Sequence, residues 1–190
     1  YYIEYGGQFE NQQRAMKRLS IIVPIVIALV FSMLCLTFGS VHHALLIMVN
    51  VPLALIGGVF GLFITGEYLS VPAAVGFIAL FGIAVQNGVV LVSYIDELKL
   101  SGIPLKDAII KGSLLRLRPV LMTAATTVLG LLPLLISTGM GSEVQRPLAV
   151  VVVFGLITST TLTLFVIPAL YEWFELIGNK LVDKYKQSYS

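Results

Sequence analysis

Gly76–Ile95, GFIALFGIAVQNGVVLVSYI, is the stretch that decides the fold. A helix of this length rises about 30 Å, roughly the thickness of the hydrocarbon core of a bilayer. The stretch carries no charge, but Gln86 and Asn87 stand side by side near its middle. An amide at that depth must find partners inside the protein, because lipid offers none. We therefore predict a membrane helix whose polar side chains face the interior of a bundle or a water-filled cavity.

The whole chain has the composition of a bundle of membrane helices. Of its 190 residues, 57% are hydrophobic and only 12% are charged, and the mean hydropathy is +0.95. A soluble domain with this balance would aggregate. The formal net charge of +2 gives no reason to expect nucleic acid as a partner. The single cysteine, Cys35, excludes a disulfide within the chain.

Five uncharged runs are long enough to span a bilayer, which predicts an all-α fold. A polar lead-in at 1–18 precedes them, and a polar tail at 175–190 follows. The longest connection, 96–118, is predicted to be a loop in which a short amphipathic helix beginning near Pro104 lies along the membrane surface. The chain begins at Tyr1, with no signal-peptide pattern, so we expect a piece of a longer protein. The predicted spans are about 19–38, 44–65, 74–95, 119–137 and 148–170.

Glycines at helical spacing predict close contacts between spans. Gly57 and Gly61 share one face of the second span, a pattern that lets two helix backbones approach closely. Close packing is the favoured interpretation, and a helix that slides along its neighbour is the alternative. Gly82, Gly130 and Gly155 are predicted to pack in the same way.

Further polar groups lie near and within the fourth span. Arg116 precedes Thr123 by seven residues, so the two share a face if the helix begins early enough. The amide pair of the third span and Arg116 each have a structural explanation as well as a functional one. Gln86 and Asn87 could join helices by hydrogen bonds or line a transport pathway, and Arg116 could reach the headgroups or a buried carboxylate. No span carries Asp or Glu, so a proton relay needs an acid from outside this chain.

Nothing in the sequence supports enzymatic chemistry or a bound metal. The adjacent pair His42 and His43 is expected at headgroup level, and no catalytic triad, phosphate loop or metal-ligand spacing is present. Five spans place the two ends of the chain on opposite sides of the membrane. The side that holds 96–118 and the tail carries most of the 12 Lys and Arg residues, which makes it cytoplasmic by the positive-inside rule.

Leu115–Ala149 is similar to the RND (resistance–nodulation–division) efflux permeases, and most of all to their heavy-metal cation branch. Order and spacing agree over nearly all of 1–174. The element that favours the metal branch over the multidrug branch is GSEVQRPLA, Gly141–Ala149. Other segments that carry the resemblance are Gly6–Ala15 (GGQFENQQRA), Val51–Gly58 (VPLALIGG) and Gly76–Ile95.

The resemblance implies that these are the last five of twelve transmembrane helices of a secondary transporter, not an enzyme, with no cofactor. The extracytoplasmic porter domains and the other seven helices would lie outside this chain. Members of the family are homotrimers in the bacterial inner membrane, joined to a periplasmic adaptor and an outer-membrane channel. The expected function is export of metal cations in exchange for protons. A multidrug exporter of the same superfamily and a non-transporting membrane subunit or sensor are the alternatives.

The resemblance also implies roles for single residues. Arg116 and Thr123 match the arginine and threonine that support proton coupling in the family. Gln86 falls where multidrug relatives carry a lysine that pairs with acidic residues on the fourth helix. A neutral amide can hydrogen-bond a carboxylate but cannot neutralise it. Gln86 and Asn87 are therefore expected to face acids that this chain does not contain, without the charge pair of the drug pumps.

Overall fold

The structure is a computed structural model. It describes residues 7–137, 139 and 141–188, without the side chains of 8, 9 and 174–188. Throughout this part of the chain the regular structure is helical, which confirms the predicted all-α class. The helices are α1 (Gly7–Phe38), α2 (Val41–Thr65), α3 (Val71–Leu100), α4 (Leu105–Ile136) and α5 (Ser142–Ser188).

Each of the five helices contains a stretch that is long and apolar enough to cross a membrane. Where α2 meets α3, both helix ends are capped by hydrogen bonds. Gly66, with φ of 70°, closes α2 in the left-handed conformation, and its backbone N–H reaches the carbonyl groups of the last turn. Ser70 then caps α3 by accepting a hydrogen bond from the backbone N–H of Ala73.

The helices extend well beyond the predicted spans. The predicted loop at 96–118 is helical on both sides of a short turn, because α3 continues to Leu100 and α4 begins at Leu105. The expected surface helix near Pro104 is the first part of α4 and not a separate element. Similarly, α1 begins within the lead-in at Gly7, and α5 continues into the tail as far as Ser188. The charged residues that marked the boundaries are good helix formers, so they end the apolar stretch without ending the helix.

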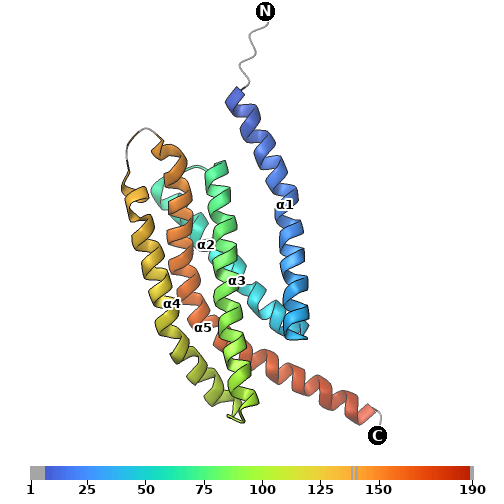
Figure 1. Ribbon diagram of the computed structural model, residues 1–190. Coiled ribbons are helices and arrows are strands. Elements are labelled where there is room, and N and C mark those ends of the chain that lie inside the picture. The colour runs from blue at the N-terminus through green and yellow to red at the C-terminus, as the bar shows by residue number, and fades with distance from the viewer. Residues whose placement is uncertain (1–6, 138, 140, 189–190) are drawn as a thin grey trace, which may run out of the picture.

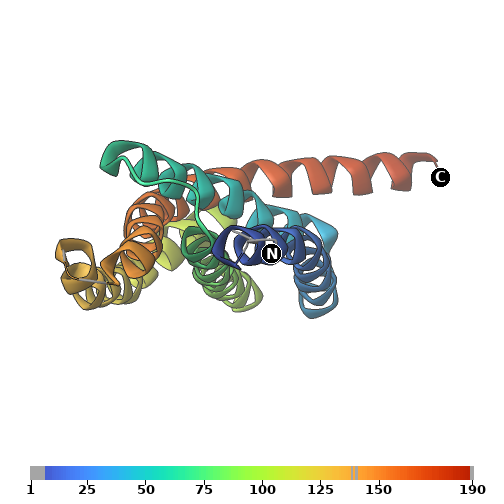
Figure 2. The same ribbon diagram turned by 90° about the horizontal axis from the view of Figure 1, so that it is seen from above.

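Helix α5 lies at the centre of the arrangement (Figures 1 and 2). It packs against α2, α3 and α4, whereas α1 lies at the edge, in contact with α2 and α3. In the most apolar stretch of α5, 56% of residues are buried, against 6% in both α1 and α4. The C-terminal part of α5 turns away from the bundle (Figure 1); α5 contains Pro168, and a proline is a common cause of such a bend.

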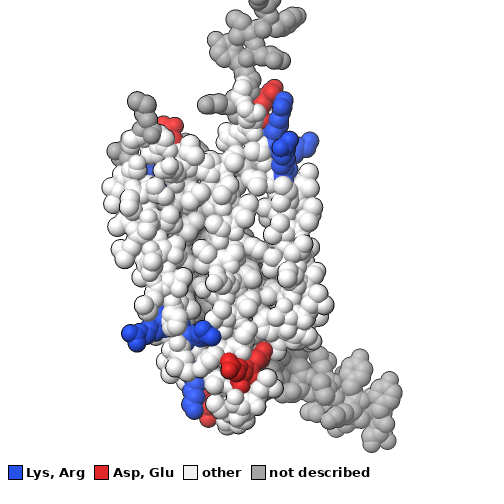
Figure 3. Space-filling view, in the orientation of Figure 1, with Lys and Arg blue, Asp and Glu red and all other residues white. Residues whose placement is uncertain are grey.

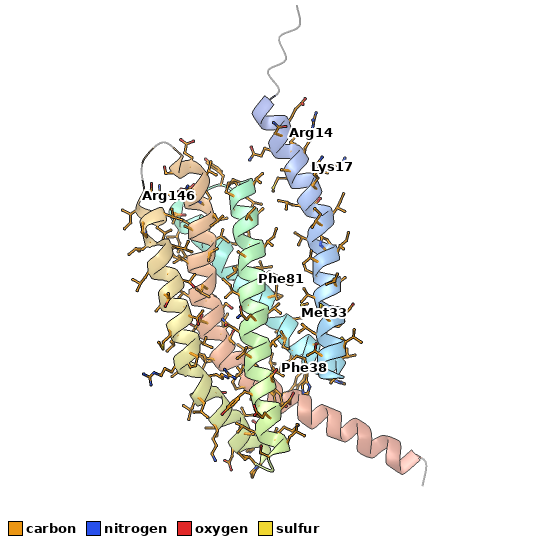
Figure 4. The ribbon with its side chains drawn as sticks, viewed as in Figure 1. Arg14, Lys17, Met33, Phe38, Phe81 and Arg146 are labelled. Carbon is orange, nitrogen blue, oxygen red and sulfur yellow. The ribbon has the colours of Figure 1, made fainter. Side chains whose placement is uncertain are left out.

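Charged side chains gather at the two ends of the bundle and leave an uncharged belt between them (Figure 3). Arg14 and Lys17 on α1 lie at the same end as Arg146 on α5 (Figure 4). There the Nε of Arg146 lies 3.5 Å from a carboxylate oxygen of Glu67, which ties the start of α5 to the turn between α2 and α3. This distribution is that of a bundle that crosses a bilayer.

Candidate functional site

A groove between α3 and α4 brings together all four residues singled out for a proton relay. Its volume is about 200 Å³, room for several water molecules. Gln86 and Asn87 contribute from α3, and Arg116 and Thr123 contribute from α4. The remaining lining residues are Ile83, Val90, Pro119, Val120 and Thr127. The polar groups of two helices thus share one open cavity within the apolar part of the bundle.

The two amides at the groove are open to partners outside this chain. Gln86 is exposed and Asn87 is half-buried. Within the described residues, neither side chain makes a hydrogen bond to the protein. An amide carries two donors and an acceptor, and leaving these unpaired in a membrane is costly. The groove therefore presents hydrogen-bonding capacity that the described part of the chain leaves unused.

Arg116 lies at one end of the groove, where its guanidinium carbon is 4.8 Å from the centroid of the Tyr94 ring on α3. This contact directs the charge across the α3–α4 hairpin, and not only toward the headgroups. Tyr94 lies in the predicted span 74–95 and was not among the predicted site residues, whereas Arg116 was placed in the predicted loop at 96–118. Because α3 ends at Leu100 and α4 begins at Leu105, Tyr94 and Arg116 lie at unequal distances from the turn, and no simple pairing of positions across the hairpin would have found this contact.

The threonines of α4 hydrogen-bond within their own helix. Thr123 Oγ1 donates to the carbonyl oxygen of Pro119 at 3.0 Å, and Thr127 Oγ1 donates to that of Thr123 at 2.9 Å. A hydroxyl that donates in this way still has lone pairs that can accept a hydrogen bond from the groove. Thr126 bonds its own helix in the same manner but does not line the groove.

Three of the five glycines selected for packing lie at close helix contacts. A Cβ on Gly57 would collide with the Thr158 side chain, one on Gly61 would lie 2.6 Å from Phe154 Cβ, and one on Gly155 would collide with Leu80. All three contacts join α5 to α2 or α3.

The other two glycines have open surroundings in this chain. A Cβ at Gly82 or Gly130 would meet nothing within 4 Å. These two glycines lie on helix faces that α2 and α5 do not cover, so the packing predicted for them does not occur within the described residues.

A buried polar chain behind α3 was not found from the sequence. Asn50 on α2 is 1% exposed, and Thr163 on α5 is fully buried. Thr163 Oγ1 lies 2.9 Å from Asn50 Oδ1, and Asn50 Nδ2 lies 3.1 Å from the carbonyl oxygen of Ala84 on α3. The sequence signal that could have pointed to this chain of hydrogen bonds is Asn50 itself, an asparagine in the middle of an otherwise apolar span.

A second polar cluster lies at the end of the bundle that holds the α3–α4 turn. The Tyr171 hydroxyl donates to a carboxylate oxygen of Asp96, whose other oxygen lies 3.8 Å from His43 Nδ1. The Tyr171 and His43 rings stack with centroids 5.5 Å apart. His43, which was expected at headgroup level, lies at this end of the bundle and packs against Tyr171 on α5. Among the described residues, no group of three His, Cys, Asp or Glu could hold a metal ion.

The fold and the groove define a class of protein, a bundle of membrane-spanning helices with a polar cavity in its apolar part. The chain belongs to the AcrB/AcrD/AcrF family, whose sequence model matches residues 1–175. This assignment, together with the relatives below, confirms the predicted resemblance to heavy-metal RND permeases.

The relatives that it matches are much longer than this chain. It is 49% identical over 171 residues to the cobalt-zinc-cadmium resistance protein CzcA of Cupriavidus metallidurans, covering 90% of this chain and 16% of CzcA. It is 52% identical over 169 residues to the nickel and cobalt resistance protein CnrA of the same organism, covering 89% and 16%. The crystal structure of a heavy metal efflux pump superposes with a TM-score of 0.81 at 49% identity, covering 90% of this chain and 17% of the pump.

Proposed function

We propose that this chain is the C-terminal membrane part of a permease that exports metal cations in exchange for protons. The observation that carries the proposal is the α3–α4 groove, in which two helices contribute four polar side chains, Gln86, Asn87, Arg116 and Thr123. The relatives' names support metal cations as the cargo. Gln86 also lacks the charge of the lysine found in multidrug relatives, which disfavours the multidrug alternative.

The groove would form one half of the relay. No acidic residue lines it, so the carboxylates that accept the proton would come from another part of the permease. Gln86 and Asn87 would donate hydrogen bonds to these carboxylates, because an amide can donate whether or not the acid is charged. Arg116 would stabilise the charged form through its positive charge. This arrangement lets an acid change its protonation state without losing its partner.

The same family membership supports a proposed setting for the permease. The permease would be a homotrimer in the bacterial inner membrane that works with a periplasmic adaptor and an outer-membrane channel. The lead-in at 1–18 would lie on the extracytoplasmic side, and the α3–α4 turn and the tail at 175–190 would lie on the cytoplasmic side. The excess of Lys and Arg at the cytoplasmic end supports this orientation.

Proteoliposomes that contain the complete permease test the function. Co²⁺ is the suitable probe, because both curated relatives are named for cobalt. A lumen made acidic should drive Co²⁺ inward as protons leave, and a protonophore should abolish the uptake. Uptake that ignores the pH gradient would argue against antiport. No uptake of Co²⁺, Zn²⁺ or Ni²⁺, with drug transport present, would favour the multidrug alternative; no transport of either would favour a non-transporting subunit.

A further inference from the structure

The hydrogen bonds of Asn50 join three helices that are far apart in the sequence. Its side chain projects from α2 between α3 and α5, where it is 1% exposed. The donor and acceptor roles in this chain follow from chemistry. The carbonyl oxygen of Ala84 can only accept, so the Asn50 atom 3.1 Å away must be Nδ2. Asn50 Oδ1 then faces Thr163, whose hydroxyl can donate to it at 2.9 Å.

The Thr163 hydroxyl has one hydrogen and two acceptors within reach. Besides Asn50 Oδ1, the carbonyl oxygen of Ser159 on its own helix lies 2.6 Å away. When the hydrogen points to Ser159, Asn50 Oδ1 loses its donor, and the link between α5 and α2 is lost while the bond from Asn50 to Ala84 remains. Thr163 therefore determines whether α5 is joined to α2 and α3 through Asn50.

This link reaches α3 directly behind the groove. Ala84 precedes Gln86 by two residues and Asn87 by three, so the carbonyl that Asn50 holds lies within about 3–5 Å of them along the helix axis. Ala84 is fully buried against α2 and α5, whereas Gln86 is exposed toward the groove.

The other buried residues in the middle of α3 are small or apolar. Their hydrophobic burial has no direction, even where Leu80 packs tightly against Gly155 on α5. A hydrogen bond to a fixed carbonyl has a required distance and angle. The buried small and apolar residues of this helix include Ala73, Gly76, Leu80 and Gly88.

We propose that Asn50 is a positioning residue for the groove: with Thr163 as its donor, it fixes the rotation and height of α3 and so presents Gln86 and Asn87 to their partners. This inference rests on the proposed proton-coupled export. It adds that the relay depends on a neutral hydrogen-bond chain from α5 through α2, on the far side of α3 from the groove.

The simpler explanation is that Asn50 and Thr163 only satisfy each other, as buried polar groups generally do. A double variant separates the two explanations. Thr163→Val alone leaves Asn50 Oδ1 buried without its partner, which should impair both stability and export. Asn50→Leu with Thr163→Val replaces both partners by apolar groups, which is close to neutral for stability. The directional contact to Ala84 is still absent, so positioning predicts that export stays impaired.

The experiment compares these variants in the complete permease by thermal unfolding and by Co²⁺ uptake at several luminal pH values. We expect the double variant to unfold at nearly the wild-type temperature, to export about tenfold more slowly, since small misplacements in a reacting site have effects of this size or larger, and to show a shifted pH profile. Thr163→Ser keeps the donor and should export normally. Wild-type export and pH profile in the double variant would overturn the proposal.

Thr160→Val is the matched control. Thr160 lies on the same helix, is 4% exposed, and its hydroxyl has no hydrogen-bond partner among the described residues. The substitution should leave both export and stability unchanged. Should the double variant not fold, Thr163→Val and Thr163→Ser decide the matter: positioning requires the serine variant, and only that one, to retain the wild-type pH profile.

A labelling measurement tests the position of α3 without transport. Ser93 is exposed on α3 and follows Gln86 by seven residues, on nearly the same helical face. Ser93→Cys, with Cys35→Ser and no other reactive thiol, reports this face by its rate of reaction with a maleimide. The double variant should change the rate several-fold, and an unchanged rate would overturn the proposal. If the wild-type permease exports no Co²⁺, the proposed function fails while this rate still decides the positioning role.

Discussion

The guanidinium carbon of Arg116 lies 4.8 Å from the centroid of the Tyr94 ring, and this contact crosses the α3–α4 hairpin at one end of the groove. An arginine near a helix end could extend to the headgroups, but here an aromatic face holds the charge beside the amides of α3. The contact gives Arg116 a fixed place in the groove.

Removing the ring of Tyr94 should weaken export. A cation–π contact contributes about 0.5–2 kcal/mol, which corresponds to about a 2- to 30-fold change in the fraction of Arg116 that is correctly placed. We expect the initial rate of Co²⁺ uptake to fall within this range for Tyr94→Leu in the complete permease. Tyr94→Phe keeps the ring and should retain the wild-type rate. Equal losses in the two variants would show that the hydroxyl, and not the ring, matters.

Arg116 and Thr123 should act as one unit. Both line the same groove, so a substitution at either one should disturb the same relay. We expect Arg116→Ala and Thr123→Ala each to slow Co²⁺ uptake. The double variant should be little slower than the slower of the two single variants. Thr126→Ala is the control, because Thr126 bonds its own helix but does not line the groove. Strictly additive effects in the double-mutant cycle would contradict a shared network.

Gly155→Ala should destabilise the bundle. The new Cβ would collide with the Leu80 side chain, and overpacking of this kind costs about 1–3 kcal/mol. The temperature of thermal unfolding of the complete permease should fall. Gly82→Ala meets open space within this chain. A loss of stability in Gly82→Ala would reveal packing against another part of the permease, and no loss in Gly155→Ala would contradict the close α3–α5 contact.

Tyr171→Phe should loosen the end of the bundle near the α3–α4 turn. It removes the hydrogen bond to Asp96 and leaves the ring packing against His43 in place. A hydrogen bond to a charged group contributes about 1.5–3 kcal/mol, and the Asp96 side chain is 26% exposed, so water recovers part of this. We expect a lower unfolding temperature, measured beside Tyr94→Phe as a control for removing a hydroxyl. An unchanged temperature would show that this contact adds nothing to stability.

The sequence predicts the fold well because membrane helices are marked by long uncharged runs. Four of the five predicted spans lie within the observed helices, and the other, 119–137, passes the end of α4 at Ile136 by one residue. The predicted ends at Phe38 and Thr65 agree with α1 and α2, whereas most of the other ends were missed. Charged residues stop an apolar run at the membrane surface without stopping a helix. The loop expected at 96–118 is therefore mostly helix.

The polar groups were harder to place, because a sequence gives the face of a residue but not the helix opposite. Gln86 and Thr123 could be assigned to polar faces, and the structure adds that these faces meet in one groove. Asn50 and Thr163, which are 113 residues apart, form a contact that no local pattern indicates. Gly82 and Gly155 were both predicted from the sequence to pack closely, yet among the described residues only a Cβ on Gly155 would meet a neighbouring side chain.

The central claim is that Gln86 takes part in proton coupling as an uncharged partner of acids outside this chain. The most direct measurement records Co²⁺ uptake and proton release together in proteoliposomes that contain Gln86→Leu in the complete permease. Ser93→Ala, a change on the same face of α3 outside the groove, is the control. We predict that both fluxes fall together in Gln86→Leu while the trimer assembles normally. Full proton-coupled export of Co²⁺ by this variant would contradict the account.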